Sequence, residues 1–294
     1  MALLETTQLG KSYGSLNALK DLNFSVDEGQ VMGLLGPNGS GKSTTLGILL
    51  GVIKNYRGSY RWFEADNSAA QRQRIGAILE TPIFYPYLSG VDNLKIAAKI
   101  KRVDKHDIER VIEQVGLSER KKSRFKTYSL GMKQRLAFAS ALLGKPEVLV
   151  LDEPTNGLDP QGIADIRKLI TELADQGLTI ILASHLLDEV EKVCSHVTVL
   201  KRGQLISSGA VNEIVQGNDE LHLKSKEPNK LLAALSKMPE LENPRINGDT
   251  VIVTVDADYN EENLNRELMQ KDIVLVGIQR IQKRLEDQFL ELTK

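Results

Sequence analysis

The apolar residues in the first two thirds of the chain follow two patterns that alternate along the sequence. Short uninterrupted apolar runs are typical of strands buried on both faces of a sheet, whereas apolar residues spaced three and four apart indicate helices. The first pattern predicts strands at 31–35, 148–151, 179–182 and 196–200. The second predicts helices at 42–51, 91–116, a stretch after Ser129, 159–174 and 186–193. Because the two alternate, we expect an α/β layer with a mainly parallel sheet.

The two ends of the chain show patterns that differ from that of residues 31–200. Residues 3–24 predict short strands separated by turns, with turn residues between Thr6 and Gly10 and again at 11–14. After about Gly217 the pattern predicts a small α+β domain with a half-exposed sheet, in the order β-α-β-β-α-β-α. Its elements are a strand at 221–224, a helix at 229–238, a hairpin at 245–255 turning at Asn247-Gly248, a helix at 261–271, a strand at 273–276 and a closing helix at 285–292.

The chain therefore divides into residues 1–217 and residues 218–294. A length of 294 residues suits one large domain and a small one. The second domain contains no constellation of catalytic residues, so we expect it to serve regulation or dimerisation.

The charge balance and the cysteine content exclude several classes of partner and site. The 38 basic and 39 acidic residues leave a net charge of −1, so no nucleic-acid partner is expected. The single cysteine, Cys194, excludes an intrachain disulfide and a CxxC zinc site, and we expect it to be a small buried apolar residue. The longest apolar stretches are too short to span a bilayer.

A glycine-rich sequence follows the first buried strand. Gly36-Pro37-Asn38-Gly39-Ser40-Gly41-Lys42-Ser43 fits the phosphate-loop pattern G-x-x-x-x-G-K-[ST] at every position. The glycines let backbone N–H groups approach phosphate oxygens, and the following helix aims the positive end of its dipole at them. Lys42 is expected to reach the β- and γ-phosphates, and Ser43 to place its hydroxyl on Mg²⁺. The alternative, a glycine-rich turn with a chance lysine, is disfavoured because a predicted strand and helix flank the loop.

Two carboxylates end the apolar run at 148–151. In open α/β folds ligands bind at the carboxyl ends of the strands, so this strand delivers Asp152 and Glu153 toward the phosphate loop. Asp152 is expected to hold Mg²⁺, and Glu153 to polarise an attacking water as a general base. The alternative is that the pair caps the next helix.

In their order along the chain, these motifs resemble the ATP-binding-cassette (ABC) ATPases over residues from about 3 to 215. The stretch 128–135, Tyr-Ser-Leu-Gly-Met-Lys-Gln-Arg, matches the region of the family signature L-S-G-G-Q. His185 matches the switch histidine that contacts the γ-phosphate, and 157–159 the loop that crosses between subunits. The resemblance implies nucleotide contacts from Tyr13, Gly36, Pro37, Asn38, Gly39, Ser40, Gly41, Lys42, Ser43, Thr44, Ser129, Gly131 and Asp159.

The resemblance also implies a fold and partners. The expected fold is a phosphate-loop cassette with an N-terminal antiparallel β subdomain and a helical subdomain at about 82–145. ATP with Mg²⁺ would lie between the phosphate loop of one cassette and Ser129 and Gly131 of a second copy or a sister ATPase. Tyr13 would stack on adenine, although an ordinary strand-end aromatic is the alternative. The chain would sit at the cytoplasmic face of the cell membrane and drive a separate multi-span permease.

The sequence departs from the family pattern at two places. Leu130 and Met132 replace the usual glycine and glutamine of the signature, while Ser129 and Gly131 remain. Glu80 stands where most relatives carry a glutamine that touches Mg²⁺ or the attacking water, and it adds a negative charge there. With the residues that follow it, this combination resembles the ATPases of bacitracin and lantibiotic export.

Three functions are therefore considered. The leading one is the ATP-hydrolysing subunit of an exporter of peptide, antibiotic or lipid-like cargo. Its permease would dock after Glu80, where Phe84, Tyr85 and Tyr87 are either exposed docking residues or local core. A soluble mechanical ATPase acting on ribosomes or DNA is the second, and the single cassette with neutral charge argues against it. A module that only sequesters ATP is the third, and the intact Glu153 argues against it.

Overall fold

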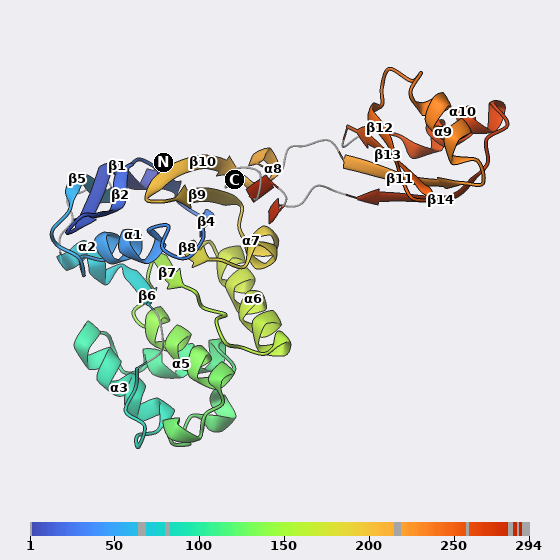
Figure 1. The fold of residues 1–294 in the computed structure, drawn as a ribbon. Helices are drawn as coiled ribbons and strands as arrows, with labels where there is room; N and C mark the ends of the chain where they lie inside the picture. The colour runs from blue at the N-terminus through green and yellow to red at the C-terminus, as the bar shows by residue number, and fades with distance from the viewer. Residues whose placement is uncertain are drawn as a thin grey trace. The chain divides into compact units, whose positions relative to one another are not determined.

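The computed structural model describes residues 2–63, 69–79, 83–214, 219–256, 259–281, 285–286 and 288–289. It separates into two compact units, Met1–Val211 and Asn212–Lys294. Figure 1 shows the first unit in blue to yellow and the second in orange to red. Each unit has a hydrophobic core of its own.

A six-stranded sheet in the order β10-β9-β4-β8-β7-β6 forms the centre of the first unit. The strands from β9 to β6 are parallel, and β10 is an antiparallel edge strand. This arrangement confirms the mainly parallel sheet, whose inner strands are buried along their length as both-face coverage requires. The bounds are β4 Val31–Leu35, β6 Ile75–Ile78, β7 Val148–Asp152, β8 Thr179–Ser184, β9 His196–Lys201 and β10 Gln204–Ala210.

A second, antiparallel sheet is built on the first strand of the chain. It contains β1 (Ala2–Tyr13), β2 (Leu16–Leu22), β3 (Ser25–Asp27) and β5 (Arg57–Trp62). The predicted turn between Thr6 and Gly10 is wrong, because that segment lies inside β1 and is paired with β5. Bulges and a positive φ of 48° at Gln8 bend the strand there without ending it.

Helix α1 (Lys42–Leu49) joins the two sheets through their shared core. Trp62 of β5 is fully buried in that core and donates its indole N–H to the Leu49 carbonyl at 2.9 Å. This bond satisfies a carbonyl at the end of α1, so the antiparallel sheet fixes the helix that follows the phosphate loop. Cys194 is buried as predicted, near α7 (Leu187–Val193). The remaining helices of this layer are α2 (Ala69–Gln73) and α6 (Pro160–Asp175), and α8 (Val211–Ile214) follows β10.

A helical region is inserted between β6 and β7 (Figure 1). The single helical stretch predicted at 91–116 is in fact two helices, α3 (Gly90–Lys101) and α4 (Asp107–Gln114). Arg102 adopts φ 59° and ψ 38° and ends α3 in the left-handed conformation. The apolar spacing continued through this break, so periodicity alone did not reveal it. Two 3-10 turns, η1 (Ser118–Arg120) and η2 (Phe125–Thr127), lead to α5 (Leu130–Leu142).

Lys101, at the end of α3, provides a test of this packing. Burial lowers the pKa of Lys101 to about 8 from an ordinary 10.5, and Asp107 opposes part of the shift. Between these pH values the unfolded chain binds a proton that the folded chain releases, so stability rises with pH. From pH 7.5 to 10 the stability of the wild type relative to Lys101→Met is expected to rise by roughly 2 kcal/mol. Urea unfolding of both proteins measures this, and parallel pH dependences would contradict it.

The second unit is an antiparallel four-stranded sheet in the order β12-β13-β11-β14. Leucines of α9 and α10 pack with Leu221, Leu223 and the valines of β13 in the core of this unit. The bounds are β11 Asp219–Ser225, α9 Pro228–Leu235, β12 Glu242–Asn247, β13 Thr250–Val255, α10 Glu261–Gln270 and β14 Leu275–Ile281. Of the predicted closing helix at 285–292, residues 287 and 290–292 lie outside the described part of the chain.

The structure of this unit corrects two of the elements predicted from the sequence. The hairpin turns at Gly248 and Asp249, because Asn247 pairs with Thr250. The strand predicted at 273–276 lies at 275–281, where the pairing with β11 continues beyond Gly277. Gly277 and the polar pair Gln279-Arg280 interrupt the apolar pattern and hid the second half of this edge strand, since edge strands need no continuous apolar pattern.

Candidate functional site

The phosphate-loop sequence forms a tight loop between β4 and α1. A Cβ atom at Gly36 would lie 2.3 Å from Ser40 Oγ and 2.4 Å from the Leu200 carbonyl oxygen, so only glycine fits there. Ser40 Oγ is buried and has no hydrogen-bond partner among the described residues. The loop therefore closes tightly at its base and keeps a buried hydroxyl group that nothing else in the described chain satisfies.

The turn between β9 and β10 supports this loop. Gly203 donates its N–H to the Ser40 carbonyl at 2.9 Å and accepts the N–H of Lys20 at 2.7 Å. A Cβ at Gly203 would lie 2.5 Å from the Ala18 carbonyl oxygen, which explains a glycine at this turn. These bonds place Arg202 and β2 beside the phosphate loop. Sequence reasoning missed them, and the only available signal was the Arg202-Gly203 turn between two apolar runs.

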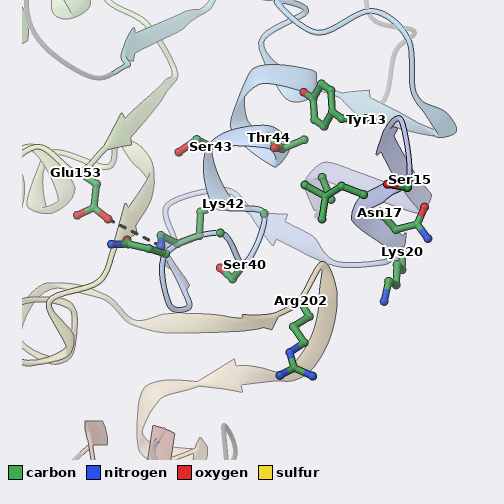
Figure 2. A pocket seen from close by; sticks show the side chains of 15 residues that line it. Tyr13, Ser15, Asn17, Lys20, Ser40, Lys42, Ser43, Thr44, Glu153 and Arg202 are labelled. Atoms are coloured by element: carbon green, nitrogen blue, oxygen red, sulfur yellow. Dashed lines mark ion pairs between the residues drawn. The ribbon is translucent and has the colours of Figure 1, made fainter.

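A cavity of about 620 Å³ opens over the loop (Figure 2). Its volume lies in the range of small-molecule sites. Tyr13, which is 49 % exposed, lines it, and Lys11 Nζ lies 4.8 Å from the centre of the Tyr13 ring. The lining residues are Tyr13, Ser15, Leu16, Asn17, Ala18, Lys20, Asn38, Gly39, Ser40, Gly41, Lys42, Ser43, Thr44, Glu153 and Arg202.

Lys42 provides the buried charge of the cavity. Its Nζ donates to the Gly36 carbonyl at 2.7 Å and lies 3.9 Å from Glu153 Oε1, the ion pair dashed in Figure 2. Burial lowers the pKa of Lys42, and the carboxylates of Glu153 and Asp152 oppose part of that shift. The ammonium is thus drawn back onto the loop, at the place where a phosphate group would compete for it.

The two carboxylates at the end of β7 have different surroundings. Asp152 is buried and pairs in register with Ala183 of β8. Glu153 donates its backbone N–H to the Ala183 carbonyl at 2.9 Å. Glu153 has φ 48°, a left-handed conformation that is strained for a non-glycine residue. This backbone turn directs the Glu153 side chain into the cavity rather than along the strand.

His185 contacts Glu153 directly. Its Nδ1 lies 2.8 Å from Glu153 Oε2, and its backbone N–H donates to the same oxygen at 3.4 Å. His185 follows β8, the strand beside β7, so the parallel register brings the two residues together from 32 positions apart. The imidazole itself does not line the cavity.

The signature residues lie outside the cavity lining. Ser129 is exposed and caps α5, accepting the Met132 N–H at 3.3 Å. A Cβ built at Gly131 would meet nothing within 4 Å, so this part of the helix start is open. Asp159 likewise caps α6, accepting the Gly162 N–H at 2.9 Å. Within the described chain these residues do not join the phosphate loop.

The comparisons with known proteins agree with this geometry. Residues 19–156 match the ABC transporter family. A bacitracin transport ATP-binding protein of Bacillus licheniformis is 37 % identical over 99 % of this chain and 97 % of its own length. A lantibiotic transport ATP-binding protein of Streptococcus pyogenes is 39 % identical over 69 % of this chain and 89 % of its own. The chain belongs to the ABC transporter family. The resemblance drawn from the motifs is thereby confirmed, including its subgroup.

A solved cassette of this family has the same fold. The structure of cbiO1 from Clostridium perfringens, part of the ABC transporter complex cbiONQ, is 31 % identical with a TM-score of 0.65. The match covers 72 % of this chain and 90 % of the solved one. The protein is therefore an ATP-binding subunit, and the cassette that it contains is an ATPase. No helix among the described residues is long and apolar enough to cross a membrane.

The residues at the cavity fit the nucleotide and metal of this family. The loop provides backbone N–H groups, a buried ammonium and the buried Ser40 hydroxyl, which suit phosphate oxygens. The Ser43 hydroxyl lies in the cavity lining, and the Asp152 carboxylate ends β7, which β8 separates from β4. Oxygen ligands of this type suit Mg²⁺. Glu80, the other predicted metal-side residue, lies outside the described residues.

The aromatic segment of the cassette after position 82 divides between core and surface. The Phe84 ring packs against Phe125 at 5.2 Å between centroids. Tyr85 and Tyr87 are 50 % and 64 % exposed, and their ring centroids lie 5.9 Å apart. Asn93 of α3 holds this segment, since its side chain accepts the Tyr85 N–H at 2.8 Å and donates to the Tyr85 carbonyl at 3.1 Å. Phe84 is thus half-buried against the buried Phe125, and the tyrosines form a fixed, exposed surface.

Proposed function

We propose that this protein is the ATP-hydrolysing subunit of an exporter for a peptide or antibiotic, working as a dimer of cassettes on a separate membrane permease. The observation that carries the proposal is the cavity over the phosphate loop, which Lys42 and Glu153 line while His185 contacts Glu153 from outside the lining. The bacitracin and lantibiotic relatives support the cargo class. The exposed caps of α5 and α6 support a second cassette, because their motifs have no role within one chain's cavity.

ATP binding follows from the loop geometry. The loop N–H groups and the start of α1 hold the β- and γ-phosphates, with Gly36 to Thr44 forming the cradle. Lys42 exchanges its Gly36 and Glu153 contacts for the phosphates. Tyr13, at the opposite wall of the cavity, stacks on the adenine. When bound, Mg²⁺ neutralises phosphate charge, and Ser43 and Asp152 are the residues that would hold it.

Hydrolysis requires a group that takes a proton from water. Glu153 accepts that proton as the water oxygen attacks the γ-phosphorus and the bond from phosphorus to the β-γ bridging oxygen breaks, giving ADP and phosphate. His185 holds Glu153 Oε2 at 2.8 Å and keeps the carboxylate aimed at the cavity. Once the γ-phosphate is bound, the same imidazole lies within reach to contact it, as the family's switch histidine does.

The second cassette completes each site in this proposal. Ser129 and Gly131 present the N-terminus of α5, whose positive dipole end suits the γ-phosphate of the partner's ATP. Asp159 lies at the start of α6 and would face the subunit boundary in this arrangement. Closure of the two cassettes on ATP and their release after hydrolysis then drive the permease.

The permease is proposed to dock on the exposed tyrosines, at the cytoplasmic face of the membrane. Tyr85 and Tyr87 give a rigid aromatic surface, which is typical of interaction sites. A tagged Glu153→Gln protein, trapped with ATP in its native cell, is expected to copurify with a multi-span protein from solubilised membranes. Adding Tyr85→Ser and Tyr87→Ser should reduce that recovery about tenfold while leaving ATP binding unchanged.

The control pair is Val52→Ser and Met269→Ser, which alter exposed apolar residues away from this surface and from the cavity. Recovery of the tagged protein with ribosomes or nucleic acid, and without a multi-span protein, would overturn the transporter proposal and favour the mechanical ATPase. Equal recovery with and without the tyrosine substitutions would contradict the docking surface alone.

A further inference from the structure

Four successive backbone carbonyls at the C-terminal end of α5 are bound by side chains from other helices. Lys101 Nζ donates to the carbonyls of Ser140 at 2.8 Å, Ala141 at 2.9 Å and Leu143 at 3.5 Å. Arg110 donates to the Leu142 carbonyl at 2.9 Å. The last carbonyls of a helix have no partner within it, so these contacts act as a cap made from α3 and α4.

The next residue along the chain is held in the same way. The Gly144 N–H donates to Asp107 Oδ2 at 2.8 Å, and Asp107 is itself paired with Arg110. A cationic side chain at a helix C-terminus also opposes the negative end of the dipole. Lys101, Asp107 and Arg110 together form the cap of α5.

The helix that this cap holds carries the signature at its other end. Ser129 is the N-terminal cap residue of α5, and the helix runs for 13 residues from Leu130 to Leu142. A helix of that length is about 20 Å long and behaves as a rigid rod, so fixing its last turn fixes the position of its first. Lys101 makes three of these contacts with one group and is half-buried against the helix end.

We propose that Lys101 is a positioning residue for ATP hydrolysis, which holds α5 so that Ser129 meets the γ-phosphate bound by the other cassette. The inference rests on the proposed sandwich of two cassettes. It assigns Lys101 an effect on the partner's site rather than on its own. The phosphate loop and Glu153 of the same chain are held separately, by β4 and β7 with their sheet neighbours on both sides.

The first test compares Lys101→Met with Lys99→Met, which removes an exposed lysine from the same helix. Methionine is an unbranched side chain one heavy atom shorter than lysine, and it removes the donors. Lys101→Met is expected to lower kcat roughly three- to tenfold without changing ATP affinity, because misplacement of a contact group reduces turnover. Lys99→Met should match the wild type. Unchanged kcat for Lys101→Met would overturn the proposal.

Mixed dimers separate positioning from a general loss of stability. When one protomer carries Glu153→Gln, the remaining active site uses the other protomer's phosphate loop and the Glu153→Gln protomer's signature. Lys101→Met should lower turnover when it lies in the Glu153→Gln protomer and leave it unchanged in the other. A merely structural role would lower turnover from either position.

Ser129→Ala in the same two positions tests the sandwich itself. If Ser129→Ala has equal effects from both protomers, the proposed dimer arrangement fails. If Ser129→Ala acts only from the Glu153→Gln protomer while Lys101→Met acts from both or neither, the inference about Lys101 fails and the proposed function stands.

A double-mutant cycle in the homodimer provides a second measurement that needs no mixed dimer. Adding Lys101→Met to Ser129→Ala is expected to cause no further loss of kcat, because Lys101 acts through Ser129. If the kcat losses of the two single variants multiply in the double variant, Lys101 acts independently of Ser129, and the inference is overturned.

Discussion

Glu153→Gln is expected to lower ATP turnover by roughly a hundred- to ten-thousandfold while ATP binding is retained. The amide keeps the size of the side chain but cannot accept the proton of the attacking water. The replacement also removes a carboxylate 3.9 Å from Lys42 Nζ, so phosphate binding loses a competitor for the ammonium. Phosphate release and equilibrium binding of a fluorescent ATP analogue measure the two effects.

The matched control for this variant is Glu113→Gln, an exposed glutamate on α4. It makes the same chemical change away from the cavity and should leave kcat unchanged. Turnover of Glu153→Gln within a factor of two of the wild type would sink the general-base assignment.

Lys42→Ala is expected to weaken ATP binding by roughly ten- to a hundredfold or more. Hydrogen bonds to charged groups contribute about 1.5–3 kcal/mol, and each 1.4 kcal/mol is tenfold in affinity. Lys42 is buried and contacts the Gly36 carbonyl, so its removal also leaves the loop less supported. Binding by calorimetry, with thermal unfolding measured in parallel, separates these contributions.

Lys54→Ala removes an exposed lysine near the end of α1 and serves as the control. It should bind ATP as the wild type does. ATP affinity of Lys42→Ala equal to that of this control would contradict a phosphate contact by Lys42. A loss of affinity accompanied by a large fall in melting temperature would instead locate the effect in the folding of the loop.

Part of the site could be read from the sequence because its chemistry is local. The phosphate loop lies between a buried strand and a helix, so its eight residues are already neighbours along the chain. Asp152 and Glu153 end a buried strand, and the carboxyl ends of parallel strands lie at the same edge of the sheet. Tyr13 followed from the family motif, and the cavity lining includes it.

Other features depended on contacts that periodicity does not encode. The interior of β1 was read as a turn because polar residues interrupt it, yet pairing with β5 keeps it extended. The break between α3 and α4 depends on one residue in the left-handed conformation, Arg102. Such choices depend on tertiary packing, which overrides weak local preferences.

The sequence by itself determined the family, the main sheet, the phosphate loop and the two strand-end carboxylates, since each is encoded by neighbouring residues. Only the tertiary structure decided that Glu153 pairs with His185, that the Gly203 turn supports the loop, and that Lys101 caps the helix of Ser129. These contacts join residues 32, 163 and 39 positions apart. Their formation depends on sheet register and helix packing, which are set by the fold as a whole.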